Sequence, residues 1–284
     1  MLKKARKEFY KYALWLPGIV LFGFAIAVPF FMGANIALTD WNGITKDYNY
    51  VGLDNFGRAL KNAAILPPLL NTLKFGLFGT LANNVAALGL ALLVCRKMRG
   101  ADLFKTVFFI PLCLSTVLVA FTWKYIYREV VPFVFGMNNP LGDPQLAIPA
   151  IILMSVWSTV GINMLIYTAG LKNVPKDLYE AAVVDGASTW KRFCNITLPM
   201  IMPSFTVCVT LTLTSYLREF SMTLSSTGGG PAGASETLAI YIYQNFYEFS
   251  KAGYAQAVSI LFMLVLVLIG LSVSSFFRKK EVEL

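Results

Sequence analysis

The sequence lacks histidine and has little charge of either sign. None of the 284 residues is His and only 14% are Asp, Glu, Lys or Arg, whereas 57% are hydrophobic and the mean hydropathy is +0.63. A soluble domain carries about 25% charged residues, most of them on its surface. The composition therefore excludes an ordinary soluble protein and indicates an integral membrane protein.

The same gaps limit the chemistry that the chain can perform. Without His the usual general base is missing, and the sequence contains no Cys-x-x-Cys, His-Glu-x-x-His or Gly-x-Ser-x-Gly motif. The glycine-rich segment 228–233 lacks the Lys and Ser/Thr of a phosphate-binding loop. We therefore expect no enzyme activity, metal site or bound cofactor in this chain. Its four cysteines, interpreted as small apolar side chains, are Cys95, Cys113, Cys194 and Cys208.

Long apolar stretches are what the sequence has in place of charge. A helix of about 20 mostly apolar residues crosses a bilayer, and the stretches do not alternate as the strands of a membrane barrel do. We expect an all-α fold with six transmembrane helices in a domain of residues 12–277, between an N-terminal segment 1–11 and a tail 278–284. The expected spans are 12–38, 69–94, 106–125, 147–171, 200–221 and 254–277.

The positive charges separate by side when the loops are assigned alternately to the two faces of the membrane. Sixteen of the 24 Lys and Arg residues fall on the side of both termini and of loop 172–199. The positive-inside rule makes that side cytoplasmic. This uneven distribution favours a membrane topology over nucleic-acid binding as the reason for the net charge of +9. The sixteen are Lys3, Lys4, Arg6, Lys7, Lys11, Arg96, Lys97, Arg99, Lys105, Lys172, Lys176, Lys191, Arg192, Arg278, Lys279 and Lys280.

One long polar segment, 172–199, interrupts the apolar sequence between the fourth and fifth spans. Pro175 suits the start of a short helix, and Asp185 with Gly186 suits its end, since glycine tolerates a positive φ. Ser188 can cap a second short helix, which we expect to end before Pro199. One interpretation is an amphipathic helix pair on lipid headgroups. The other is docking to a cytoplasmic partner, which its small residues would allow to approach closely: Ala181, Ala182, Gly186 and Ala187.

The sequence EAAVVDGASTWKRFCNITLP, which starts at Glu180, resembles a family motif. It is similar to the EAA loop of binding-protein-dependent ABC importer permeases, E-A-A-x-x-D-G-A followed by an apolar position and I-x-L-P. The segments LTDWNG, YVGLDNF, NTLKF, FKTVFFIP and TGGGPAGASETL extend the resemblance, to carbohydrate permeases of the maltose and glycerol-phosphate type, over nearly the whole chain. The matching positions are Glu180, Ala181, Ala182, Asp185, Gly186, Ala187, Phe193, Ile196, Leu198, Pro199 and Pro203.

This resemblance implies a MetI-like type I importer permease, with five core spans and an added first span. The loop would couple the chain to an ATPase: Glu180 would contact that subunit or pin the first short helix, and Gly186 would make the turn. The implied partners are a second homologous permease, two ABC ATPase subunits that use ATP and Mg, an extracytoplasmic solute-binding protein and membrane lipid. The implied location is the cell (inner) membrane of a bacterium or archaeon.

Polar side chains within the spans are candidates for a substrate path, because they are costly in a membrane. Thr212, Tyr216 and Glu219 follow at i, i+4 and i+7, so they share one helix face whose hydroxyls, ring and carboxylate suit a sugar. Alternatively, the threonines bond their own helix and Glu219 lies at the outer headgroups. Asn163 needs a partner on a neighbouring helix. The fourth span's candidates are Ser155, Thr159, Asn163 and Trp157, the last of which either packs or stacks on a sugar.

These features predict the transmembrane permease subunit of an ATP-driven ABC importer for a sugar, oligosaccharide or polyol. Closure of the ATPase would reach the spans through the EAA loop and produce alternating access. An importer permease for a different small solute stays open, because such permeases share the loop. An ion-driven secondary carrier is disfavoured, since acidic residues are nearly absent from the spans.

Overall fold

The computed structural model describes residues 15–95 and 100–281. These residues form helices and contain no strand; extended residues pair only at an isolated bridge between Thr39 and Tyr50. The expectation of an all-α fold is confirmed. The N-terminal segment 1–11, the first residues of the first span, the cations at 96, 97 and 99 and the end of the tail lie outside the described residues.

Long helices account for most of the chain, and four of them are apolar enough to cross a membrane. Two further helix pairs pass the same test but bend at a short break, by 101° for Ala101–Cys113 with Thr116–Phe135 and by 70° for Thr189–Met200 with Met202–Leu217. Counting each bent pair as one span gives six spans, as expected from the sequence. The four single helices are Trp15–Ala37, Ala63–Val94, Ala147–Asn173 and Ala252–Arg278.

The chain forms two compact units, of which the first comprises residues 1–62 and 242–262. Buried Asn55, in the helix Asp54–Lys61, connects that helix to the loop after the first helix: its side-chain amide donates to the carbonyls of Ala37 at 3.0 Å and Thr39 at 2.7 Å. In the same loop Asp40 accepts the backbone N–H of Asn49 at 2.6 Å, which lowers the pKa of Asp40. The helices of this unit are α2 (Val28–Ala37), α3 (Asp54–Lys61), the π-helix Gln244–Glu248 and the start of α15 (Ala252–Arg278).

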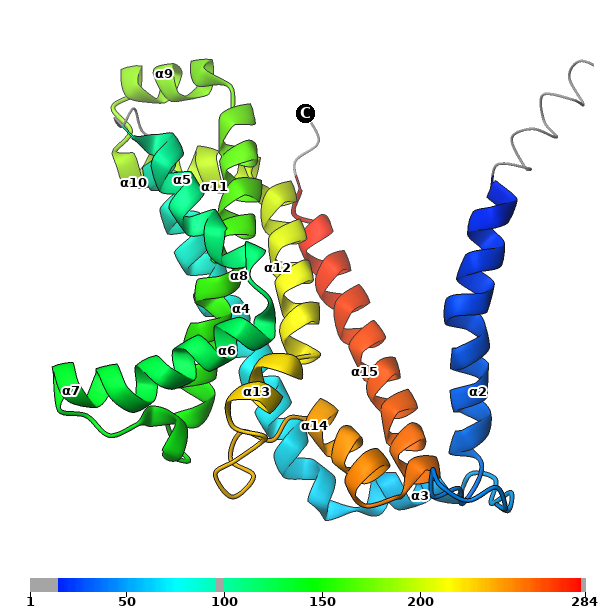
Figure 1. Ribbon diagram of the computed structural model, residues 1–284. Coiled ribbons are helices and arrows are strands. Elements are labelled where there is room, and N and C mark those ends of the chain that lie inside the picture. The colour runs from blue at the N-terminus through cyan, green and yellow to red at the C-terminus, as the bar shows by residue number, and fades with distance from the viewer. Residues whose placement is uncertain (1–14, 96–99, 282–284) are drawn as a thin grey trace, which may run out of the picture. The chain divides into compact units, whose positions relative to one another are not determined.

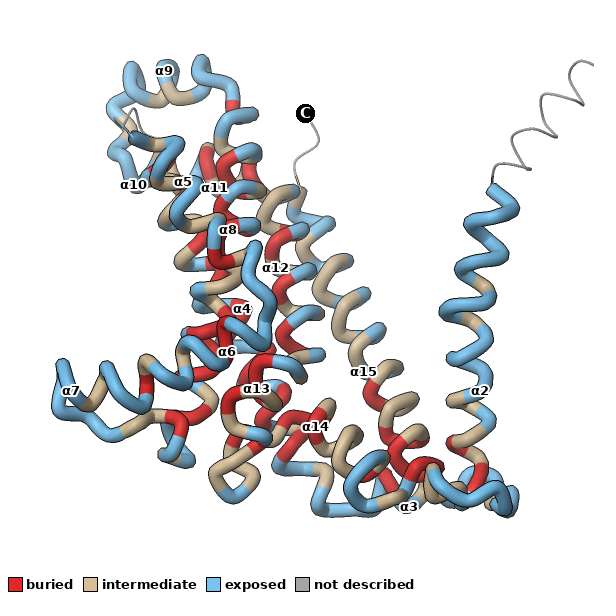
Figure 2. The backbone as a smooth tube through the Cα atoms, viewed as in Figure 1, coloured by how far each residue is buried: buried red, intermediate tan, exposed pale blue. Residues whose placement is uncertain are grey.

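The second unit comprises residues 63–241 and 263–284. Three of its helices, α4 (Leu66–Val94), α8 (Ala147–Asn173) and α12 (Met202–Leu217), pack against one another and form its core (Figure 1). Buried residues concentrate where these three helices meet (Figure 2). The shorter helices around them are α5 (Ala101–Phe109), α6 (Thr116–Tyr125), α7 (Val131–Phe135), α13 (Ser221–Ser226) and the first turn of α14 (Leu238–Tyr243).

Glycines let the helices of the second unit approach one another closely. A Cβ added at Gly79 of α4 would overlap the ring of Tyr216 on α12, and one added at Gly161 of α8 would overlap the carbonyl oxygen of Phe108 on α5. Helices in a bilayer associate through such van der Waals contacts, because burial of apolar surface gives little advantage over contact with lipid. Small residues therefore set the spacing of this bundle.

The expected third span, 106–125, falls on a bent pair of helices, Ala101–Cys113 and Thr116–Phe135. After α5 the chain forms a 3₁₀ turn at Ile110–Cys113, becomes extended at Leu114 and restarts as α6, where Ser115 Oγ accepts the backbone N–H of Leu118. Pro111 contributes to this break because it has no N–H for the helical ladder. The helix then continues beyond residue 125 through a π-helix, Ile126–Val130, into α7. A count of apolar residues detects the span but not its bend.

The contact at Gly161 generates a prediction about stability. Gly161→Ala places a methyl group against the carbonyl of Phe108, which should cost about 1–3 kcal/mol, as overpacking does at other tight sites. We expect a lower midpoint of thermal unfolding for the purified protein in detergent. Gly89→Ala is the matched control, because nothing lies within 4 Å of an added Cβ there. Equal melting of the two variants would contradict the packing described.

Candidate functional site

Residues 175–200 form a bent pair of short helices, called the elbow below, at one end of the second unit (Figure 1). The first arm is α9 (Lys176–Val184), which follows Pro175. The second arm is α10 (Thr189–Arg192), a π-helix at Phe193–Thr197 and α11 (Leu198–Met200). The elbow follows α8 and precedes α12 in the chain. A displacement of the elbow therefore acts directly on two of the three core helices, α8 and α12.

The second arm does not end before Pro199, so this expectation was wrong. Pro199 lies in the first turn of α11, where a helix leaves its N–H groups unpaired and tolerates proline. The chain changes direction slightly later, at Ile201, which separates the arm from α12. The 70° bend at this point lets the arm lie across the end of the bundle.

The turn between the arms depends on Gly186. The backbone N–H of Gly186 donates to the carbonyl of Val183 at 3.0 Å, and that of Ala187 donates to the carbonyl of Ala182 at 2.9 Å. These two bonds form a Schellman motif, which requires a left-handed residue at its bend. Gly186 supplies it with a φ of +71°. The expected glycine turn is therefore present in the structure, and its geometry explains why the residue is glycine.

One side-chain contact joins the two arms, and two further contacts order the second arm. The hydroxyls of Tyr179 on the first arm and Thr197 on the second lie 2.9 Å apart, within hydrogen-bond distance. The rings of Trp190 and Phe193 stack with their centroids 5.7 Å apart. Ser188 caps the second arm by accepting the backbone N–H of Lys191 at 3.3 Å, as expected. The elbow is thus an ordered structure even where it projects from the bundle.

The tip of the elbow is accessible and has few partners within the chain. Val184 is 88% exposed, and a Cβ added at Gly186 would meet nothing within 4 Å. Glu180 and Asp185 are exposed and form no ion pair within the described residues. Among the described residues, nothing neutralises these two charges. Among the other predicted coupling residues, Ala181 is exposed, and those only partly buried are Ala182, Ala187, Phe193 and Pro199.

A hydrogen-bonded cluster, called the polar network below, joins the three core helices. Asn83 of α4 donates its side-chain amide to the hydroxyls of Thr159 at 2.8 Å and Tyr216 at 3.0 Å. Asn163 of α8 donates to Asn83 Oδ1 at 2.6 Å and to the hydroxyl of Thr212 at 2.7 Å. The hydroxyls of Thr159 and Tyr216 lie 2.9 Å apart. The structure therefore brings together four predicted residues from two helices and adds Asn83 from a third.

Burial makes these bonds important for the packing of the bundle. Asn83 has no exposed surface, and Asn163, Thr212 and Tyr216 are each at most 6% exposed. An amide or hydroxyl in a lipid-excluded core is costly unless it is paired. The partner that Asn163 was expected to need is present on both neighbouring helices. The polar network consequently fixes how the three helices face one another.

A cavity of about 230 Å³ lies beside the polar network, between α8 and α12. Thr159, Asn163, Thr212 and Tyr216 form part of its wall, although their polar groups already bond one another. Ser215 is exposed to the cavity, and its hydroxyl forms no hydrogen bond within the described residues. A solute in this space would therefore meet one free hydroxyl directly and the polar network behind it.

The expected stripe of Thr212, Tyr216 and Glu219 does not lie on one continuous helix. The helix α12 ends at Leu217, and the chain turns before Glu219. The Glu219 carboxylate accepts the backbone N–H of Met222 at 2.7 Å and so caps the start of α13. The i, i+4, i+7 spacing identifies a face only while the helix continues.

The two remaining candidates lie away from the cavity wall. Ser155 is buried one turn before Thr159, whose hydroxyl donates to its carbonyl at 2.7 Å. Trp157 packs edge to face against Trp123, with the ring centroids 5.8 Å apart. This contact favours the packing interpretation of Trp157 over stacking on a sugar.

Asn83 is the functional candidate that the sequence reasoning missed. Its signal was present, because Asn83 and Asn84 are adjacent amides within a mostly apolar span. Asn84 accepts the hydroxyl of Tyr167 at 2.7 Å and so adds a second link between α4 and α8. The residues predicted from the sequence for a substrate path all lie in the fourth and fifth spans, whereas Asn83 lies in the second.

Comparison with known proteins identifies related transport permeases. Residues 83–281 match the family described as binding-protein-dependent transport system inner membrane component. The probable starch degradation products transport system permease protein AmyD of Thermoanaerobacterium thermosulfurigenes is 28% identical over 295 residues, covering 100% of both chains. The trehalose/maltose transport system permease protein MalF of Thermococcus litoralis is 32% identical over 243 residues, covering 80% of this chain and 82% of its own.

Solved structures agree at the level of the fold. A chain of a bacterial ABC transporter involved in the import of the acidic polysaccharide alginate superposes with a TM-score of 0.83. It is 22% identical in sequence, and the alignment covers 98% of each chain. A chain of the MetNI methionine ABC transporter superposes with a TM-score of 0.58 at 17% identity, covering 77% of this chain and 96% of that one. The fold is therefore that of type I ABC importer permeases.

The polar network generates a prediction about helix association. Asn83→Ala removes two donated bonds and the acceptor of Asn163, leaving buried groups unpaired, and should cost about 1–3 kcal/mol. We expect a lower thermal unfolding midpoint of the purified protein. Asn195→Ala, at an exposed position, is the control and should change stability by less than about 0.5 kcal/mol. A loss no larger than that of the control would show that the network does not hold the bundle.

Proposed function

Because the chain belongs to the binding-protein-dependent transport system inner membrane component family, we propose that it is the permease subunit of an ATP-driven importer for a sugar, oligosaccharide or polyol. The observation that carries this proposal is the elbow: an ordered, exposed helix pair whose Glu180 and Asp185 form no ion pair with any residue that the structure describes, connected without a linker to two core helices. Such a structure can receive a displacement from another protein and pass it to the membrane-spanning part.

The chain itself performs no covalent chemistry in this proposal. Two ABC ATPase subunits hydrolyse ATP with Mg, and one of them receives the elbow in a cleft. A second homologous permease completes the membrane pathway, and an extracytoplasmic solute-binding protein delivers the solute. Glu180 contacts the ATPase in this arrangement, because it has no ion-pair partner among the described residues that would pin its own helix.

The elbow side of the chain is cytoplasmic in this proposal, in the cell (inner) membrane of a bacterium or archaeon. Lys172, Lys176, Lys191 and Arg192 lie in or next to the elbow, and this local excess of cations supports the assignment. Both termini then lie on the same side. The opposite end of the second unit, with α13, faces outward and is the side from which solute enters.

The cavity beside the polar network is the proposed substrate path within this chain. Neutral hydroxyl and amide groups suit a solute rich in hydroxyls, whereas the described part of the cavity wall offers no charged group to an ion. A carbohydrate is further supported by the names of the relatives, which concern starch degradation products, trehalose and maltose. The contacts proposed for the solute are Ser215 and, on the facing helix, Thr159 and Asn163.

Gly186→Val tests the proposed coupling. Valine is strained at a φ of +71° and would also separate the elbow from a close partner surface. We expect the variant to insert in the membrane but to lose solute uptake by about tenfold or more, which a coupling loss of about 1.4 kcal/mol already produces. The wild-type protein, purified from detergent, should bring down an ATPase and its ATP hydrolysis activity. The variant should bring down less of both.

Gly136→Val is the matched control, because Gly136 has a φ of +63° and open space around it but follows α7, away from the elbow. It introduces comparable backbone strain and should leave uptake near the wild-type level. Normal uptake by Gly186→Val would count against the coupling role. Transport by the purified protein without any ATPase would instead favour an ion-driven carrier.

Ser215→Val tests the proposed path. The change removes the free hydroxyl in the cavity and should lower uptake about fivefold, the effect of one hydrogen bond of about 1 kcal/mol. Uptake is measured against solute concentration at equal amounts of assembled transporter. Thr214→Val is the control, because the Thr214 hydroxyl bonds the carbonyl of Thr210 on its own helix and does not line the cavity. Equal kinetics in the two variants would exclude Ser215 from the path.

A further inference from the structure

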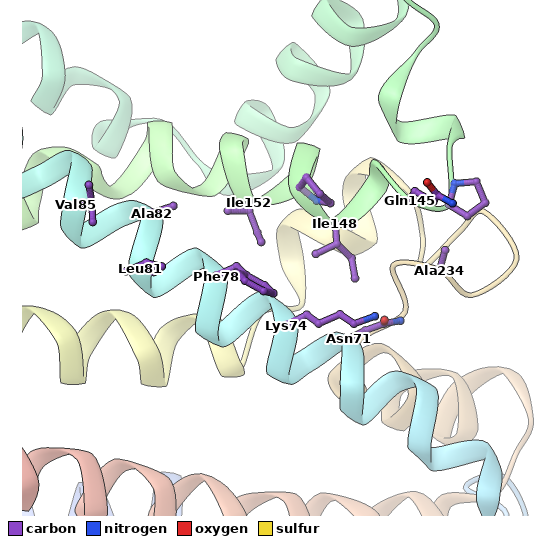
Figure 3. A pocket seen from close by; sticks show the side chains of 12 residues that line it. Asn71, Lys74, Phe78, Leu81, Ala82, Val85, Gln145, Ile148, Ile152 and Ala234 are labelled. Carbon is purple, nitrogen blue, oxygen red and sulfur yellow. The ribbon is translucent and has the colours of Figure 1, made fainter.

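A groove of about 830 Å³ lies on the outside of the second unit, along α4 and the start of α8. Phe78, Leu81 and Val85 line one wall, and Ile148 and Ile152 line the other (Figure 3). The three α4 side chains are 55–64% exposed, although the helices around them are well packed. The groove is thus an apolar surface that is hollow rather than filled by this chain.

Polar groups gather at one end of the groove. The Lys74 side chain runs along α4 toward the side chain of Asn71, and Gln145 lies at the same end (Figure 3). Lys74 is exposed and forms no ion pair within the described residues, and none of the residues that line the groove is acidic. A cation there needs a negative partner, because an unpaired ammonium group next to hydrocarbon is costly.

The length of the groove matches one leaflet of a bilayer. Lys74, Phe78, Leu81 and Val85 follow at i, i+4, i+7 and i+11, so they form one stripe along α4. At about 1.5 Å per residue this stripe is about 16 Å long. Half of a hydrocarbon core of about 30 Å is about 15 Å. A lipid tail starting at Lys74 would therefore reach the middle of the membrane at Val85.

We propose that this groove binds a phospholipid with an anionic headgroup, in the leaflet on the side opposite the elbow. The headgroup phosphate pairs with the Lys74 ammonium, and one acyl chain lies between Phe78 and Leu81 of α4 and Ile152 of α8. A transmembrane helix of a partner protein fits less well, because it would need a groove of about 30 Å and an acidic residue placed opposite Lys74. This site is distinct from the cavity proposed for the solute.

The experiment uses the whole transporter, purified in detergent, stripped of lipid and then incubated with phosphatidylglycerol or phosphatidylcholine. Native mass spectrometry measures the lipid that each complex retains. We expect the wild type to prefer phosphatidylglycerol. Lys74→Gln should lower phosphatidylglycerol retention about fivefold, to the level of phosphatidylcholine, since one lysine near a membrane surface has about that effect on an anionic lipid. Leu81→Trp, which fills the apolar groove, should lower the retention of both lipids.

Two control variants carry the same types of substitution at positions outside the groove. Lys124→Gln removes an exposed lysine on α6, and Leu77→Trp enlarges an exposed α4 residue outside the groove; both should retain lipid as the wild type does. Retention by Lys74→Gln equal to that of Lys124→Gln overturns the proposal. A photoreactive amino acid at Phe78 gives an independent measurement: a lipid adduct supports the site, and an adduct with a second protein subunit overturns it.

Discussion

The side-chain amide of Asn83 is the point on which the packing of the second unit depends. Its oxygen and nitrogen together connect α4 to α8 and α12, and no water reaches it because it is completely buried. Apolar packing alone gives helices in lipid little preference for one rotation over another. Directional bonds from a single residue remove that freedom, and the close contact of Gly79 with Tyr216 then fits only one arrangement.

The hydrogen bonds of Asn83 lie on the same helices that carry the elbow, so the elbow and the core of the second unit are mechanically connected. The elbow is attached to α8 and α12, and the polar network holds these same two helices to α4, near the middle of α8 and near the end of α12 that is remote from the elbow. The two arms of the elbow are joined by Tyr179 and Thr197, so they move as one body. A push on the elbow is therefore passed along α8 and α12 to the polar network.

The sequence predicted features that depend on local rules and missed those that depend on tertiary contacts. Span number, the turn at Gly186 and the cap at Ser188 follow from hydropathy, the φ that glycine allows and capping preferences. The break at Leu114 follows Pro111, a local signal that a count of apolar residues does not use, whereas helical spacing carries no sign that α12 ends before Glu219. Asn83 was missed for another reason, since its polarity was visible but its partners lie 76 and 133 residues away.

The polar network consists of uncharged groups, which separate more easily during the proposed transport than an ion pair would. A buried ion pair resists separation because each partner left alone is a bare charge, which costs about 3–5 kcal/mol. Hydrogen bonds between neutral side chains inside membrane proteins contribute only about 0.6 kcal/mol on average, because new partners are readily found. Sugar hydroxyls are such partners. The hydrogen bonds that hold α8 and α12 together can thus be replaced by hydrogen bonds to a solute with a small loss of free energy. A site that opens in every transport cycle requires this.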